Sequence, residues 1–218
     1  LEAAKDVAAE FINGRPNDNI GITLFAGETF TQCPLTVDHA VLLDMIHNIK
    51  CGLIEDGTAV GMGIANAVTR LKDSKAKSKV IILLTDGTNN KGDISPLTAA
   101  EIAKSFGIRV YTIGVGTNGM APYPYPVGNT VQYVNMPVEI DEKTLTQIAG
   151  TTDGNYFRAT SNSKLKEVYE EIDKLEKTKL NVKEYSKRDE EYQWFALAAF
   201  LCVLLEVLLR NSILKKIP

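Results

Sequence analysis

The sequence predicts an α/β protein built on a doubly wound, mostly parallel sheet, followed by a separate apolar helix. The run Val80 to Leu84 is apolar throughout and ends at Thr85-Asp86-Gly87. A strand without polar alternation is typical of a parallel sheet with helices over both faces. A helical pattern over 97–106 and an apolar strand pattern over 109–115 follow. Strand, helix and strand at this spacing predict a right-handed βαβ unit.

The segments before this unit carry helix and strand patterns of their own. Gly14 stops the first helical pattern, Ala26-Gly27-Glu28 joins two short strands into an expected edge hairpin, and Asp38 is a candidate N-cap. Helices are expected over 1–13, 41–49 and 59–71, and strands over 20–25 and 29–32.

After the βαβ unit, the segment 118–138 interrupts the pattern with four prolines. We expect an inserted loop there, with a small hairpin around Gly128-Asn129 as an open alternative. A short helix over 145–149, a strand over 155–158 and a last helix with apolar residues from 165 to 175 complete the domain. The predicted domain covers residues 1–176.

The end of the chain is expected to be a charged stalk and a membrane helix. Residues 177–191 are charged and mixed in sign, and Trp194 to Leu209 are apolar except for Glu206. With its borders, the segment 192–214 reaches the roughly 20 residues that a transmembrane helix needs. The alternative, a buried amphipathic helix of a soluble domain, needs a polar face that Glu206 alone does not provide.

Charge and cysteine spacing argue against several classes of function. The formal net charge is -3 and no basic stripe is free of interleaved acids, so nucleic-acid binding is not expected. Cys33, Cys51 and Cys202 form no Cys-x-x-Cys pair, which indicates neither a zinc site nor a disulfide framework. Leu1 opens within a helical pattern and is not methionine, so we expect a fragment of a longer chain.

Two stretches are similar to motifs for nucleotide binding and phosphate transfer, but each lacks a feature that the chemistry requires. Gly114 to Gly119 fits G-x-G-x-x-G, but the proline-rich segment that follows cannot begin the helix that binds pyrophosphate. Leu84-Thr-Asp-Gly-Thr88 is similar to the haloacid-dehalogenase signature Asp-x-Asp-Gly-Thr. Leu84 occupies the position of the nucleophilic acid, so the covalent step is lost.

Thr58 and Asp86 are the candidate site residues. Asp86 follows a predicted strand and Thr58 precedes a predicted helix, so both are expected at the carboxyl edge of the sheet, where ligands bind in such folds. Their oxygens suit a hard divalent ion such as Mg²⁺, although two ligands are too few for a tight site. In the plainer alternative, Asp86-Gly87 only makes a turn.

The chain resembles the von Willebrand factor A (VWA) domain family, and more narrowly the bacterial aerotolerance (Bat) family of membrane-anchored VWA proteins. Thr58 in Glu55-Asp-Gly-Thr-Ala59 and Asp86 in Leu84-Thr-Asp-Gly87 are similar to the second and third elements of that family's metal-ion-dependent adhesion site. The first element, Asp-x-Ser-x-Ser, is absent together with the first strand. Val-Glu-Ile-Asp-Glu at 138–142, Asn155 to Ala159 and the terminal apolar helix are similar to the Bat pattern.

The resemblance implies a Rossmann-like VWA fold and a non-enzymatic role in protein interaction. An Mg²⁺ ion would accept a carboxylate from a partner protein, with weak or no binding in this chain because the first element is missing. Implied partners are other membrane VWA proteins and a MoxR-type ATPase, in a complex for envelope or stress tolerance. The implied location is the bacterial inner membrane, with the domain in the periplasm. The alternative function is a metal-dependent hydrolase or phosphotransferase at the same sheet edge.

Overall fold

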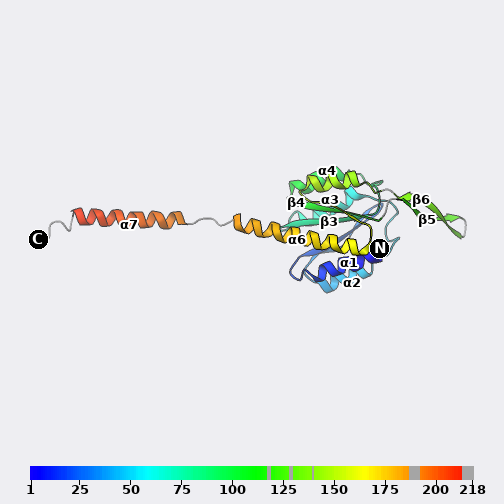
Figure 1. The fold of residues 1–218 in the computed structure, drawn as a ribbon, viewed down its shortest axis with the longest axis horizontal. Coiled ribbons are helices and arrows are strands. Elements are labelled where there is room, and N and C mark those ends of the chain that lie inside the picture. Colours follow the sequence, from blue (N-terminus) through cyan, green and yellow to red (C-terminus); the bar gives the residue numbers. More distant parts are fainter. Residues whose placement is uncertain (117–118, 128–129, 139, 187–191, 213–218) are drawn as a thin grey trace. The chain divides into compact units, whose positions relative to one another are not determined.

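The computed structural model describes the chain except for residues 117–118, 128–129, 139, 187–191 and 213–218. Its contacts divide the chain into two compact units, Leu1–Lys177 and Thr178–Pro218. The first unit contains the strands and the helices that cover them, and the second contains helix α7, Tyr192–Ser212 (Figure 1).

The central sheet has three parallel strands in the order β3-β4-β7. They are β3 (Lys79–Thr85), β4 (Ile108–Val115) and β7 (Tyr156–Ala159). The register of β3 and β4 runs without a break from Lys79 opposite Ile108 to Thr85 opposite Gly114. The predicted parallel α/β fold is therefore confirmed.

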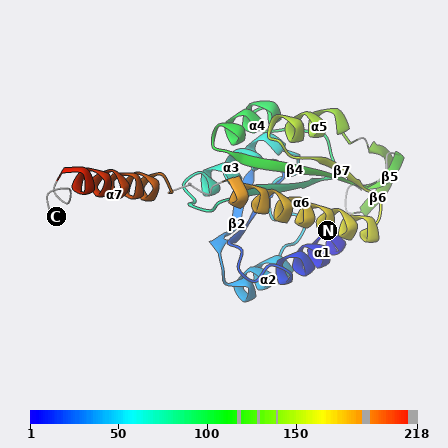
Figure 2. The same cartoon turned by 60° about the vertical axis from the view of Figure 1, so that its left-hand side comes forward.

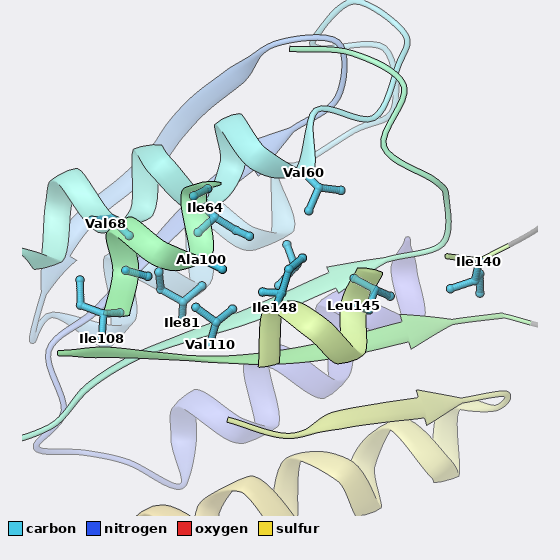
Figure 3. Close-up of a cluster of buried hydrophobic side chains, with 13 residues drawn as sticks. Val60, Ile64, Val68, Ile81, Ala100, Ile108, Val110, Ile140, Leu145 and Ile148 are labelled. Atoms are coloured by element: carbon cyan, nitrogen blue, oxygen red, sulfur yellow. The ribbon is translucent and has the colours of Figure 1, made fainter. Parts of the chain in front are cut away.

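Helices cover both faces of this sheet, because alternate strand residues point to opposite sides. Val110 on β4 lies in the core with α3 (Val60–Leu71), α4 (Pro96–Ser105) and α5 (Glu142–Thr151) (Figure 3). Its neighbour Tyr111 lies in the second core, with α1 and α6. Figure 2 shows the central strands between these two groups of helices. The bounds of the second group are α1, Glu2–Asn13, and α6, Asn162–Ser186.

A separate antiparallel hairpin stands beside the central sheet. It consists of β1 (Ile20–Phe25) and β2 (Thr29–Thr36), as the sequence predicts, and it packs with α2 (His39–His47). Among the described strands, β1 pairs only with β2 and β3 pairs only with β4, so each has an unpaired edge. Helix α3 contacts both β1 and β3.

The proline-rich segment is more regular than expected. Strand β5 (Gly119–Val127) pairs antiparallel with β6 (Thr130–Val138) over their whole length, from Gly119 opposite Val138 to Val127 opposite Thr130. The expected loop is therefore wrong, and the hairpin that the sequence left as the alternative is confirmed by the pairing of Val127 with Thr130. Gly128 and Asn129 themselves lie outside the described residues. Proline is excluded from strand positions that must donate a ladder hydrogen bond, but it is tolerated at positions facing an open edge.

The predicted transmembrane helix is not supported. Within the described residues, no helix combines the length and the apolar character required to cross a membrane. The uninterrupted apolar stretch of α7 lies between Gln193 and Glu206 and is shorter than the roughly 20 residues of a typical span.

Candidate functional site

Asp86 lies directly after β3, at the carboxyl end of the parallel sheet. Thr85 is buried, whereas the Asp86 side chain is exposed. The Gly87 amide donates a hydrogen bond to Thr85 Oγ1 at 3.3 Å, across the bend at which the chain leaves the strand. The turn thus presents a carboxylate to solvent at the edge where α/β sheets bind ligands.

Thr58 lies just before α3, whose N-cap is Ala59. The Thr58 amide donates to Asn90 Oδ1 at 2.9 Å, and the Asn90 amide donates to the Thr58 carbonyl at 3.0 Å. These two bonds tie the segment before α3 to the loop after β3. The backbone of Thr58 is therefore held by a residue 32 positions away in the sequence.

The structure places Thr58 beside the turn that carries Asp86. A Cβ atom at Gly87 would lie 3.2 Å from Thr58 Oγ1, so the threonine hydroxyl is directed at the turn that carries Asp86. That distance is tight for a Cβ contact, so glycine at position 87 leaves room for the Thr58 hydroxyl. The two loops that carry Thr58 and Asp86 thus adjoin and form one surface.

A third loop supports this surface from β1 and β2. The Ala59 amide donates to the Ala26 carbonyl at 2.7 Å, and the Gly27 amide donates to the Glu55 carbonyl at 2.7 Å. A Cβ atom at Gly27 would lie only 2.8 Å from the Glu55 carbonyl oxygen. Glycine at 27 therefore allows the β1–β2 turn to approach the chain before Thr58.

Two asparagines organise the site and were not identified from the sequence. Besides the bond from Asn90 to Thr58, Asn89 Oδ1 accepts from the Gly61 amide at 3.5 Å, in the first turn of α3. The sequence feature that could have identified them is the Asn-Asn pair directly after Asp86-Gly-Thr88. Such side chains often hydrogen-bond backbone groups, but the sequence does not say which backbone they meet.

A pocket of about 420 Å³ includes the same loop. It is lined by Thr88, Ile140, Asp141, Glu142 and Lys143. Asp141 Oδ1 accepts from the Thr144 amide at 3.0 Å and caps α5. The hydrogen bonds from Thr144 lower the pKa of the Asp141 carboxyl.

The pocket wall is braced by an ion pair. Arg158 Nη1 on β7 donates to Glu142 Oε1 at 2.8 Å. The pair joins the last strand of the sheet to the first turn of α5. The pocket therefore adjoins Asp86 through Thr88 and has one wall fixed to the sheet.

The donor chemistry fits a hard cation, but the protein ligands are few. The Thr58 hydroxyl and the Asp86 carboxylate are oxygen donors of the kind that Mg²⁺ prefers. Among the described residues, no three His, Cys, Asp or Glu side chains are grouped as a metal site. The predicted site thus has two candidate ligands, carried by two adjoining loops.

The histidines lie elsewhere, on α2. One ring nitrogen of His39 is 3.0 Å from the Asp18 carbonyl oxygen, and His47 Nδ1 is 2.7 Å from the Leu43 carbonyl oxygen. Neither residue belongs to the three loops that form the site.

A second polar cluster lies near the amino ends of the central strands. Glu176 on α6 is 4% exposed and accepts from Tyr111 Oη at 2.6 Å, from Arg109 Nε at 2.9 Å and from Ser78 Oγ at 2.9 Å. Burial raises the pKa of Glu176, but these hydrogen bonds outweigh it and lower the pKa below the ordinary value. Its burial and its satisfied bonds mark this cluster as structural.

Solved structures with the same fold include two bacterial proteins. BatB from Bacteroides thetaiotaomicron is 33% identical, with a TM-score of 0.69, over 81% of this chain and 88% of that chain. An aerotolerance-related membrane protein from Bacteroides fragilis is 29% identical, with a TM-score of 0.68, over 79% and 86%. Proximal thread matrix protein 1 from the mussel byssus, described with a zinc-occupied MIDAS motif, is 25% identical, with a TM-score of 0.60, over 80% and 40%.

Curated relatives are longer than this chain. An uncharacterized protein from Borreliella burgdorferi is 26% identical over 218 residues, which are all of this chain and 64% of the relative. A UPF0353 protein from Nocardia farcinica is 30% identical over 191 residues, or 79% of this chain and 56% of the relative.

A sequence model of the von Willebrand factor type A domain matches residues 1–171. That match covers all the strands and loops described above, and the likeness to BatB agrees with the narrower resemblance. The chain belongs to the von Willebrand factor type A domain family and is similar to its Bat members.

Proposed function

We propose that the protein is an interaction module that binds a carboxylate of a partner protein through a divalent cation held by Thr58 and Asp86. The observation that carries the proposal is the approach of Thr58 Oγ1 to the Asp86-Gly87 turn, at 3.2 Å from where a Gly87 Cβ would be. Two loops far apart in sequence converge there and present a hydroxyl and an exposed carboxylate at one sheet edge.

Each residue has a distinct task in this proposal. When bound, Mg²⁺ supplies a hard acceptor for a second carboxylate, in addition to that of Asp86. Thr58 contributes a neutral oxygen, and Asn90 fixes the backbone from which that oxygen projects. Gly87 leaves room for the hydroxyl. The exposed position of Asp86 allows a partner side chain to reach the site.

Further ligands would come from water, from the partner, or from an added strand that ends in Asp-x-Ser-x-Ser. The unpaired edges of β1 and β3 favour the strand, because α3 packs on both and one strand between them would join the two sheets. A strand parallel to β3 would end beside Asp86. The bonds of Gly27 and Ala59 already hold the neighbouring loops at that edge.

Calorimetry with Mg²⁺ tests the assignment on two chains, residues 1–218 and the same chain with such a strand added upstream. We expect weak or no binding by the first and clear binding by the second, lost in Asp86→Ala and in Thr58→Ala. Asp93→Ala is a matched control, because Asp93 is exposed in the same loop region but lies outside the proposed site. Tight binding by residues 1–218, or full binding by the extended Asp86→Ala chain, contradicts the proposal.

We propose binding rather than catalysis at this edge. A hydrolase or phosphotransferase would need a base or nucleophile beside Asp86. The position that holds the nucleophile in Asp-x-Asp-Gly-Thr is Leu84, which packs in the core with α1 and α6. Release of phosphate from a generic phosphomonoester, abolished by Asp86→Ala, would favour the enzyme instead.

The named neighbours also motivate a proposed setting. Because one is an aerotolerance-related membrane protein, we propose that this protein works at a bacterial inner membrane, with the domain in the periplasm. Proposed partners are other membrane VWA proteins and a MoxR-type ATPase. Protease added to spheroplasts should remove the domain. A periplasmic marker protein that is degraded in the same sample shows that the outer face is accessible. Protection of the domain while that marker is degraded contradicts the periplasmic location.

A further inference from the structure

The four prolines of the β5–β6 hairpin all occupy one kind of register position. Pro122, Pro124 and Pro126 pair with Asn135, Tyr133 and Val131, and Pro137 pairs with Met120. In an antiparallel ladder, positions that exchange hydrogen bonds alternate with positions whose N–H and C=O point away from the partner strand. Proline has no N–H to exchange, so the prolines take the outward positions.

This assignment makes the two outer edges of the hairpin unequal. Along the outer edge of β5, the outward residues from 122 to 126 are all proline and offer carbonyls without donors. Along the outer edge of β6, Val131, Tyr133 and Asn135 each offer both a backbone N–H and a C=O. The outer edge of β5 is therefore closed to strand pairing from 122 to 126, whereas the outer edge of β6 is open from 131 to 135, before the outward Pro137.

From Val131 to Asn135 the open edge also lacks the usual protection, because the one proline of β6, Pro137, lies beyond that stretch. Natural edge strands are commonly guarded by charged side chains, especially lysine, or by proline. Residues 119–138 contain no Asp, Glu, Lys, Arg or His, in a chain of which 23% is charged. The hairpin forms a sheet of only two described strands, and an isolated two-stranded sheet is marginally stable in water. Such an edge favours the addition of another strand.

We propose that this edge pairs with the same edge of a second copy of the chain, β6 against β6 in antiparallel orientation. The register centred on Tyr133 places it opposite the Tyr133 of the second copy, and Val131 opposite Asn135. All three outward positions then form hydrogen-bonded pairs, each exchanging two backbone bonds. The edge is uncharged, so two copies meet without electrostatic repulsion.

The proline edge determines where assembly stops. Antiparallel pairing of identical edges is an isologous contact with twofold symmetry. The resulting four-stranded sheet has β5 at both ends, where prolines block further strands. Each chain therefore uses the one open edge of its β5–β6 hairpin, and pairing through the hairpins gives a dimer and not a filament. The dimer would present two copies of the Thr58 and Asp86 surface, but its formation does not depend on metal.

Sedimentation of residues 1–218 in mild detergent, over a range of concentrations, tests the proposal. We expect a dimer. Tyr133→Pro removes the central outward N–H of β6 while sparing the bonds to β5, and should weaken dimerisation at least about tenfold. Met120→Pro is the matched control, because position 120 faces outward on β5; it should leave the dimer intact. A monomeric wild type, or a Tyr133→Pro chain that dimerises normally, overturns the proposal.

Two further measurements test the edges directly. Replacing Pro122, Pro124 and Pro126 by threonine opens the second edge and should produce species larger than a dimer; a strict dimer would contradict the role of the prolines. Amide exchange should show protection at Val131, Tyr133 and Asn135 that rises with protein concentration. The inward amides of 132, 134 and 136 should be protected at every concentration. Protection at the outward amides that appears only after another protein is added overturns self-pairing.

Discussion

Thr58 and Asn90 are joined by two hydrogen bonds that run in opposite directions. The Thr58 amide donates to the Asn90 side chain, and the Asn90 amide donates to the Thr58 carbonyl. This exchange fixes the position of a candidate metal ligand from a loop that follows another strand. The proposed site therefore depends on Asn90, whose side-chain oxygen accepts from the Thr58 amide and is not one of the proposed ligands.

We expect Asn90→Ala to weaken Mg²⁺ binding by the extended chain severalfold, because Thr58 loses a partner for its amide. The free energy of unfolding should fall by only about 1 kcal/mol, as for one partly exposed hydrogen bond. Calorimetry and thermal unfolding measure the two effects. Asn48→Ala, at the C-cap of α2, is the control. Equal metal affinity in Asn90→Ala and Asn48→Ala would contradict this role.

Gly87→Ala should weaken metal binding through Thr58. The added Cβ would lie 3.2 Å from Thr58 Oγ1, so the hydroxyl must shift by a few tenths of an ångström. A double-mutant cycle with Thr58→Ala checks the cause. If the two substitutions act through the same contact, Gly87→Ala should cost much less affinity when Thr58 is already alanine. Additive losses would show that Gly87 acts elsewhere.

Acid should remove part of the stability through Glu176. Its pKa is lowered in the folded protein from an ordinary value of 4.5, so its contribution is present above about pH 4.5 and is lost as the pH falls through the lowered value. Glu176→Gln should therefore flatten the fall in unfolding free energy below pH 4.5. Denaturant titrations between pH 3 and pH 7, in steps of about one unit, measure this. If the difference in unfolding free energy between wild type and Glu176→Gln does not change with pH, the titration of Glu176 does not contribute to acid sensitivity.

Glu176→Ala should be more damaging than Glu176→Gln. It removes the acceptor of Arg109 and Tyr111 and leaves a partly buried guanidinium unpaired, which costs about 3–5 kcal/mol in buried ion pairs. Glu170→Ala, at an exposed position of the same helix, is the control. Chemical denaturation compares the three variants, and similar costs for Glu176→Ala and Glu170→Ala would contradict a structural role for the cluster.

Two glycine-to-alanine substitutions should have opposite effects on stability. A Cβ atom at Gly61 would lie 2.0 Å from the Ile94 carbonyl oxygen, so Gly61→Ala must separate α3 from the segment before α4 and should cost about 1–3 kcal/mol. A Cβ atom at Gly150 meets nothing within 4 Å, so alanine should stabilise α5 by about 0.5–1 kcal/mol. Thermal midpoints test both, and a tolerated Gly61→Ala would show that the close approach is relaxed in solution.

The central strands could be predicted because local pattern determines them. A short apolar run rich in β-branched residues and followed by glycine, such as Val80 to Leu84 before Asp86-Gly87, is typical of a covered strand that ends in a turn. The prolines of β5 misled the prediction, since proline disfavours strands on average. The register with β6 indicates that these prolines occupy the outward positions of β5. The sequence of one strand does not show which of its positions face the neighbouring strand.

By itself, the sequence determined the parallel fold, the β1–β2 hairpin and the placement of Thr58 before a helix and Asp86 after a strand. These features depend on spacing and on residues within one turn or one strand. Only the tertiary structure decided that Thr58 Oγ1 faces Gly87, that Asn90 holds Thr58, and that β1 and β3 keep unpaired edges among the described strands. Those relations join residues about 30 positions apart or more, and they depend on how α3 packs against both sheets, which no local pattern encodes.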